Sequence, residues 1–198
     1  MEFYIKIGLT GGIGAGKSVV SKLLKNMGYP VFDTDKEAKI LMDESPIIVN
    51  ALKDKYGEEV YQNNKLNREF LASKIFADKD NLTFVNNLVH PLVKDAFEAW
   101  VKKQKSRIVF LESAILYESG FDRFMNYVWF VKASKELRAN RVVKRDNCTA
   151  DDVEKRINSQ MDDSLKEKKA SVIIQNDEQT AIIPQIIYSI NNVIESNN

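Results

Sequence analysis

Short apolar stretches alternate with an amphipathic segment over the first 35 residues of the chain. Phe3 to Leu9 is rich in aromatic and β-branched side chains, which predicts a buried strand. Tyr29 to Phe32 predicts a second short strand, which ends at Asp33-Thr34-Asp35. Between them we expect a helix that stops at Gly28 and has one apolar face, formed by Val19, Val20, Leu23, Leu24 and Met27.

From Lys36 to about Lys105 the apolar positions have helical spacing. They fall into three groups: Ile47, Ile48 and Leu52; Phe70, Leu71 and Ile75; and Leu92, Val93, Phe97 and Val101. We find no convincing strand pattern in this stretch. We therefore expect residues 36–105 to be a helical insertion.

Strand-like segments return after the insertion, at 107–112, 127–131 and 171–174. Two charged helical segments, 134–146 and 149–161, lie between the last two, and a final helix spans about 178–195. Strands that alternate with helices indicate a parallel sheet with right-handed crossovers. The prediction is an α/β fold in which 1–35 and 106–198 form a five-stranded parallel sheet flanked by helices, with a helical lid at about 134–161.

The charges of the chain nearly cancel, with 29 Lys plus Arg against 28 Asp plus Glu in 198 residues. This balance argues against a nucleic-acid binder that works through a broad basic field. The only cysteine, Cys148, has no disulfide partner within the chain, which fits a reducing compartment. The N-terminal residues are too charged for a secretory signal, and no apolar run approaches the roughly 20 residues that cross a bilayer. We expect a cytoplasmic protein that uses neither a membrane nor an obligate protein partner.

Gly11 to Ser18 matches the phosphate-binding pattern G-x-x-x-x-G-K-[ST] in full. Glycines let successive backbone N–H groups converge on phosphate oxygens, and the N-terminus of the following helix adds positive potential at the same place. Lys17 can reach the β- and γ-phosphates of a nucleotide, and the Ser18 hydroxyl is a ligand for Mg²⁺. Because the motif follows a predicted strand and opens a predicted helix, it predicts nucleotide binding.

Asp33 and Asp35 leave the second predicted strand at the edge of the sheet where ligands bind in open α/β folds. A kinase that acts on a hydroxyl needs a carboxylate to orient that group and accept its proton. Capping competes with this role, because Asp33 or Thr34 is a good N-cap and Thr34-x-x-Glu37 has capping-box spacing. We expect Asp33 to be mainly a cap and Asp35 to be the catalytic carboxylate.

Arg138, Arg141 and Arg145 recur at helical spacing and place three guanidinium groups on one helix face. Such a helix can close over ATP, stabilise charge on the transferring phosphoryl group and exclude water. The alternative is a solvated charged surface, since acidic residues surround the arginines. The position of the helix between the last two strands of a phosphate-loop protein favours a lid.

Taken in order, these and other segments resemble the dephospho-coenzyme A kinases. The segments are Gly8 to Ser18, Asp33-Thr34-Asp35, Val89-His90-Pro91, Ile115-Leu116-Tyr117-Glu118, Arg141-x-x-x-Arg145-Asp146, Gln160 and Asn176. They cover nearly the whole chain. This chain differs in having Ala15 for a common serine, Tyr117 for phenylalanine, Arg138 where glutamine is frequent and Ser171 for a common aspartate.

The resemblance implies that ATP phosphorylates the ribose 3′-hydroxyl of dephospho-coenzyme A, the last step of coenzyme A synthesis. It also implies that the helical insertion at 36–105 binds this acceptor. It implies catalytic roles for Lys17, Asp35 and Arg141, and an acceptor site with Asp33, Asp35, His90 and Glu118. Mg²⁺ would bind Ser18 together with the ATP phosphates. The implied ATP site consists of Gly11, Gly12, Ile13, Gly14, Ala15, Gly16, Lys17, Ser18, Val19, Arg141, Arg145 and Asn176.

Other functions are compatible with the same phosphate-binding motif. Only the ordered family segments argue against a kinase that acts on a nucleoside, a nucleoside monophosphate or shikimate. A regulatory GTPase needs Asp-x-x-Gly after a strand, but Asp54 to Gly57 lies in the helical insertion. The sequence also leaves open whether Glu112 or Glu118 supports the metal. Judged from the residues alone, His90 is a packed or capping residue, and the resemblance implies that it is part of the acceptor-site wall or a structural support, without proton transfer.

Overall fold

The computed structural model describes residues 4–197, apart from the side chains of residues 76 and 77. The chain divides into two compact units, Met1–Phe32 with Gln104–Asn198, and Asp33–Lys103. Phe3, where the first strand was predicted to begin, lies outside the described residues. Within them, no helix is both long and apolar enough to span a membrane.

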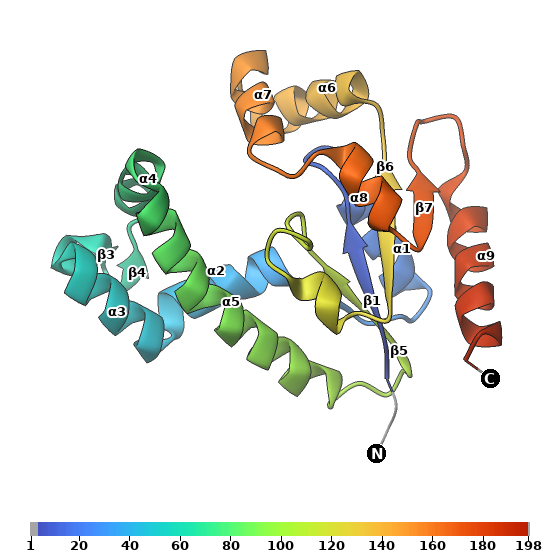
Figure 1. The fold of residues 1–198 in the computed structure, drawn as a ribbon, viewed down its shortest axis with the longest axis horizontal. Helices are drawn as coiled ribbons and strands as arrows, with labels where there is room; N and C mark the ends of the chain where they lie inside the picture. The colour runs from blue at the N-terminus through green and yellow to red at the C-terminus, as the bar shows by residue number, and fades with distance from the viewer. Residues whose placement is uncertain (1–3, 198) are drawn as a thin grey trace. The chain divides into compact units, whose positions relative to one another are not determined.

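The first unit is built on a parallel sheet of five strands in the order β2-β5-β1-β6-β7, as the alternation of strands and helices predicted (Figure 1). β1 (Ile5–Thr10) is central and pairs with β5 (Ile108–Glu112) on one side and β6 (Tyr127–Lys132) on the other. β2 (Val31–Asp33) and β7 (Val172–Gln175) are the outer strands. All five predicted strands are confirmed to within a few residues.

Two helices supply the apolar layer on one face of this sheet. α1 (Lys17–Asn26) and α9 (Ile182–Glu195) share a buried cluster with the strands, to which α1 contributes Val20 and Leu24 and α9 contributes Ile186, Ile190 and Val193. Gly28, with φ 89°, follows the end of α1, where the Tyr29 N–H bonds the Leu24 carbonyl at 3.0 Å. Val19 was expected on the buried face but is 49% exposed, because the following position, Val20, faces the sheet.

The predicted lid segments form two helices that follow β6. α6 (Lys135–Asp146) is capped by Ser134, and α7 (Ala150–Asn158) begins with a capping box between Thr149 and Asp152. A further helix, α8 (Asp163–Lys169), packs against β6 and was not predicted. A short 3₁₀ turn, η2 (Phe121–Phe124), links β5 to β6.

The second unit is mainly helical. Its helices are α2 (Thr34–Glu44), α3 (Pro46–Tyr56), α4 (Arg68–Ala77) and α5 (Lys79–Val101), with a 3₁₀ turn η1 (Glu58–Val60). α2 packs against α5, and Val89, Val93 and Phe97 of α5 are buried.

The expectation that this region holds no strand was wrong. Two-residue strands β3 (Tyr61–Gln62) and β4 (Lys65–Leu66) pair as an antiparallel hairpin. Asn63 and Asn64 form its turn with φ values of 52° and 58°, the left-handed conformation that two-residue hairpin turns need and that asparagine tolerates. Strands of two residues leave no alternation for a sequence pattern to detect.

Candidate functional site

The phosphate loop lies where the sequence placed it, between β1 and α1 in the first unit. Gly14 and Gly16 have φ values of 79° and 91°, in the region that L side chains rarely adopt. Gly16 is the N-cap residue of α1, so the loop delivers its end directly to the helix N-terminus. This is the backbone arrangement that binds phosphate oxygens.

Lys17 is folded back over its own loop. Its Nζ donates to the carbonyl oxygens of Gly11 at 2.9 Å and Gly12 at 3.4 Å. Ser18, the predicted metal ligand, is exposed on the first turn of α1. The cation and the hydroxyl that the motif requires are therefore both at the end of the loop.

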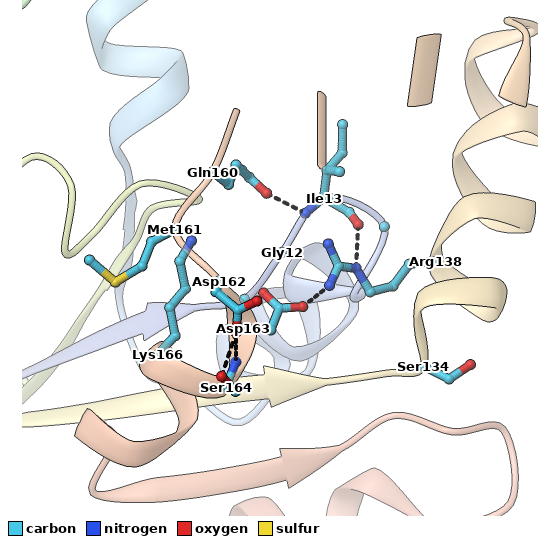
Figure 2. A network of polar contacts seen from close by, with 12 residues as sticks. Gly12, Ile13, Ser134, Arg138, Gln160, Met161, Asp162, Asp163, Ser164 and Lys166 are labelled. Atoms are coloured by element: carbon cyan, nitrogen blue, oxygen red, sulfur yellow. Dashed lines mark hydrogen bonds and ion pairs between the residues drawn. The ribbon is translucent and has the colours of Figure 1, made fainter. Parts of the chain in front are cut away.

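The apex of the loop, at Ile13, is bound by two residues from the lid region (Figure 2). Gln160 Oε1 accepts the Ile13 N–H at 3.0 Å, and Arg138 Nε donates to the Ile13 carbonyl oxygen at 2.9 Å. Arg138 also forms an ion pair with Asp163 at the start of α8. Its side chain is only 4% exposed, and this burial lowers the pKa of the guanidinium.

The other end of the loop is bound by Asn176, which follows β7. Its Nδ2 donates to the Ala15 carbonyl oxygen at 2.8 Å. A Cβ at Gly16 would lie 2.0 Å from this nitrogen, so only glycine fits there. Arg141 Nη2 donates to the Asn176 carbonyl oxygen at 3.2 Å and pairs with Glu178 at 3.0 Å. The predicted ATP residues Arg141 and Asn176 thus lie beside the loop.

The three lid arginines have different surroundings. Arg138 is buried under the loop and Arg141 is partly exposed beside it, whereas the Arg145 side chain is 61% exposed. Arg145 Nε donates to Asp146 at 2.7 Å, and this hydrogen bond raises the pKa of Arg145 and lowers that of Asp146. Asp146 also pairs with Arg156 of α7.

The two glutamates left open by the sequence have separate partners. Glu112, at the end of β5, accepts a hydrogen bond from Ser21 Oγ at 2.6 Å, and Ser21 lies one turn of α1 after Ser18. Glu118 pairs with Lys166 at 2.8 Å and accepts the Met161 N–H at 2.8 Å. Glu112 therefore lies on the Ser18 side of α1, while Glu118 joins the segment after β5 to α8.

In the second unit, Asp33 is the N-cap of α2, and its Oδ1 accepts the Lys36 N–H at 2.9 Å. The capping-box alternative at Thr34 is wrong, because Thr34 is already the first helical residue. Asp35 is exposed in the first turn of α2. The negative charge of a carboxylate there interacts favourably with the positive end of the helix dipole.

His90 lies within α5, directly before Pro91. The side chain is partly buried, and this desolvation lowers the pKa of the imidazole below its ordinary value. The wall or support role that the resemblance implies for His90 stays a prediction.

Sequence reasoning missed Asp163 and Lys166 of α8. Lys166 is fully buried, and its Nζ also donates to the Ala114 carbonyl oxygen at 3.2 Å. One signal was available, because the segment begins with Asp162 and Asp163 and ends with Lys168 and Lys169, the charge order that favours a helix.

Comparisons with known proteins identify the family of this chain. The family model for dephospho-CoA kinase matches residues 5–181. A dephospho-CoA kinase of Bacteroides fragilis is 46% identical over 184 residues, covering 92% of this chain and 90% of the relative. A dephospho-CoA kinase of Porphyromonas gingivalis is 40% identical over 190 residues, covering 96% of this chain and 94% of the relative.

A solved structure from Thermus thermophilus superposes on this chain with a TM-score of 0.85 at 30% identity, covering 99% of both chains. The similarity therefore extends over both units, including the segments predicted to form a lid. Together with the family model and the relatives, it establishes that this chain belongs to the dephospho-CoA kinase family.

Proposed function

We propose that this protein transfers the γ-phosphoryl group of ATP to the ribose 3′-hydroxyl of dephospho-coenzyme A, giving coenzyme A and ADP. The observation that carries the proposal is the phosphate loop from Gly11 to Ser18, in a chain that matches the family model from residue 5 to 181. The dephospho-CoA kinase names of the relatives favour this acceptor over a nucleoside, a nucleoside monophosphate or shikimate.

The loop and Lys17 are proposed to hold the β- and γ-phosphates. The Lys17 ammonium donates to the carbonyl oxygens of Gly11 and Gly12, so its charge lies at the loop. Phosphate oxygens offer stronger acceptors than neutral carbonyls, because hydrogen bonds between two charged groups are shorter and stronger. ATP binding would therefore exchange these contacts for contacts with phosphate.

The residues near Ser18 fit Mg²⁺. The Ser18 hydroxyl and the Glu112 carboxylate are both hard oxygen donors, the type that Mg²⁺ prefers, and Ser21 links Glu112 to the same helix. A Mg²⁺ ion bound with ATP neutralises charge on the phosphates. We propose Ser18 as the protein ligand and Glu112, rather than Glu118, as the carboxylate that supports it.

Asp35 is proposed as the base that orients the acceptor hydroxyl and takes its proton. It follows the carboxyl end of β2 by two residues, and the carboxyl ends of parallel strands are where such sheets bind ligands. Asp33, whose Oδ1 caps α2, is proposed to fix the position of this first turn beside the acceptor. His90 and Glu118 are proposed to support the acceptor site.

Arg141 and Arg145 are proposed to contact ATP when the lid closes. Arg141 lies 3.5 Å from the Gly14 carbonyl oxygen and donates to Asn176 on the adenine side expected from the resemblance. An arginine there stabilises charge that develops on the transferring group. We further propose that the protein works in the cytoplasm, without an obligate protein partner.

A coupled ADP-release assay across acceptors tests the proposal. The purified protein is given Mg·ATP with dephospho-coenzyme A, a nucleoside, a nucleoside monophosphate or shikimate, and the 3′-phosphorylated product is identified by mass. We expect turnover with dephospho-coenzyme A alone. Turnover with a nucleoside monophosphate but not dephospho-coenzyme A refutes the proposed acceptor.

A further inference from the structure

The peptide groups of Ile13 are held from outside the phosphate loop on both sides. Its N–H is accepted by Gln160, which follows α7, and its carbonyl oxygen accepts from Arg138 of α6 (Figure 2). These partners lie 147 and 125 residues away in the sequence. The conformation of the loop apex therefore depends on the lid region as well as on the glycines.

Arg138 makes this contact as a buried cation. Its guanidinium bonds the Ile13 carbonyl through Nε and pairs with Asp163 through Nη1, while the exposed fraction of the side chain is 4%. The group also lies directly on Gly12, since a Cβ on Gly12 would be 2.1 Å from Arg138 Nη2. A side chain at position 12 would therefore collide with the guanidinium of Arg138.

The surroundings on the other side of Arg138 are open. A pocket of about 530 Å³ borders Arg138 and Asp163 and is lined by residues of α6, α7 and α8. On this side Arg138 makes a directed contact, its ion pair with Asp163, beside a lining that contains both polar side chains and the apolar Ile157 and Met161. The ion pair with Asp163 therefore sets the orientation of the Arg138 guanidinium.

We propose that Arg138 is a positioning residue for phosphoryl transfer, which holds the Ile13–Gly14 peptide of the phosphate loop in its phosphate-binding conformation and is itself oriented by Asp163. The proposal rests on the proposed kinase function. Its physical basis is preorganisation: a loop already fixed by Arg138 does not have to be ordered when ATP binds. Lysine cannot replace it, because a single ammonium lacks the planar fork that bonds Ile13 and Asp163 together.

A simpler role is a structural tie between α6 and α8, and the two roles predict different results. A buried ion pair replaced by apolar residues of similar volume often keeps or gains stability. The double variant Arg138→Met with Asp163→Leu should therefore remain folded while it loses the donor to Ile13. A structural tie predicts normal ATP binding in this variant, and a positioning role predicts weak binding.

The experiment measures Mg·ATP binding by calorimetry in the absence of any acceptor, together with thermal unfolding and amide exchange at Ile13 and Gly14. The variants are Arg138→Met, Arg138→Lys, Asp163→Asn and the double variant. Glu154→Gln is the control, because Glu154 pairs with Lys135 across α6 and α7 without a contact to the loop. Since no acceptor is used, the result is independent of whether dephospho-coenzyme A is the substrate.

We expect Arg138→Met and the double variant to bind ATP roughly 10- to 100-fold more weakly, as the loss of a charged hydrogen bond implies. Amide hydrogen exchange at Ile13 should be faster in these two variants. Arg138→Lys should bind ATP about as weakly as Arg138→Met, and Asp163→Asn should lose less ATP affinity. Wild-type ATP affinity and exchange in the folded double variant would overturn the proposal. An equal loss of affinity in Glu154→Gln would overturn it too.

Discussion

The side-chain amide of Gln185 pairs with the main chain of Gln175: its Oε1 accepts the Gln175 N–H at 2.8 Å and its Nε2 donates to the Gln175 carbonyl oxygen at 3.0 Å. Gln175 ends β7, an outer strand of the sheet, so α9 satisfies polar groups that would otherwise be available to another strand. The pair also fixes the start of α9 against the sheet.

Gln185→Leu is therefore expected to lower the free energy of unfolding by roughly 1–2 kcal/mol, because the substitution removes both hydrogen bonds to Gln175 and a third, partly exposed one from Nε2 to the Ala181 carbonyl oxygen. For a chain of this size that corresponds to a fall in melting temperature of about 2–8 °C. Thermal and urea unfolding measure it, with Gln179→Leu, an exposed glutamine before α9, as the control. Equal stability of the two variants would contradict the assignment.

Asp35→Asn should reduce kcat by roughly 10²- to 10⁴-fold, the usual contribution of a general base, while KM for ATP stays close to wild type. The amide keeps the size of the side chain but cannot accept the hydroxyl proton. Glu37→Gln, in the same first turn of α2, is the matched control. A kcat for Asp35→Asn within threefold of that of the control would exclude Asp35 as the base.

Glu118→Gln should destabilise the fold. The neutral amide leaves Lys166, whose side chain is fully buried, without its carboxylate partner. We expect a loss of roughly 1–3 kcal/mol, reduced by the 24% exposure of Glu118. Urea unfolding measures the change. The double variant Glu118→Leu with Lys166→Met should recover most of the stability, and a double variant as unstable as Glu118→Gln would contradict this account.

Stability should fall as the pH drops below about 6.5, because burial lowers the pKa of His90 in the folded protein. Between the pKa of His90 in the unfolded chain and its lower pKa in the folded protein, the unfolded chain binds the proton more readily, so acid favours unfolding. The free energy of unfolding stops falling once the pH is below the folded-state pKa. His90 is the only histidine, so one imidazole resonance reports its titration. His90→Gln should flatten the pH dependence of urea unfolding in this window; an unchanged slope would refute it.

The sequence predicted the sheet and the phosphate loop because both depend on local patterns. Buried strands have apolar runs, and the loop has glycines at fixed spacing before a lysine. The contacts of Arg138, Gln160 and Asn176 with that loop could not be predicted in the same way, because they join residues 125 to 161 positions apart. Only the folded chain determines which side chains meet.

Two errors in the predicted helices have local causes. The last helix was expected from about residue 178 but begins at Ile182, because Asp177 accepts the N–H groups of Gln179 and Thr180 and forms a turn first. Ile47 was counted with the buried face of its helix, yet it is 61% exposed. Periodicity predicts that a helix has an apolar face, but it does not determine which residue lies at the edge of that face.

The support of the first loop by residues 138 to 176 has a consequence for the order in which the protein is made. Synthesis runs from the N-terminus, so Gly11 to Ser18 leave the ribosome long before Asn176. A nascent chain that ends before β7 has the whole nucleotide motif but not the side chain that bonds Ala15. The hydrogen bond from Asn176 to the phosphate loop therefore forms only after residue 176 has been synthesised, long after the loop itself.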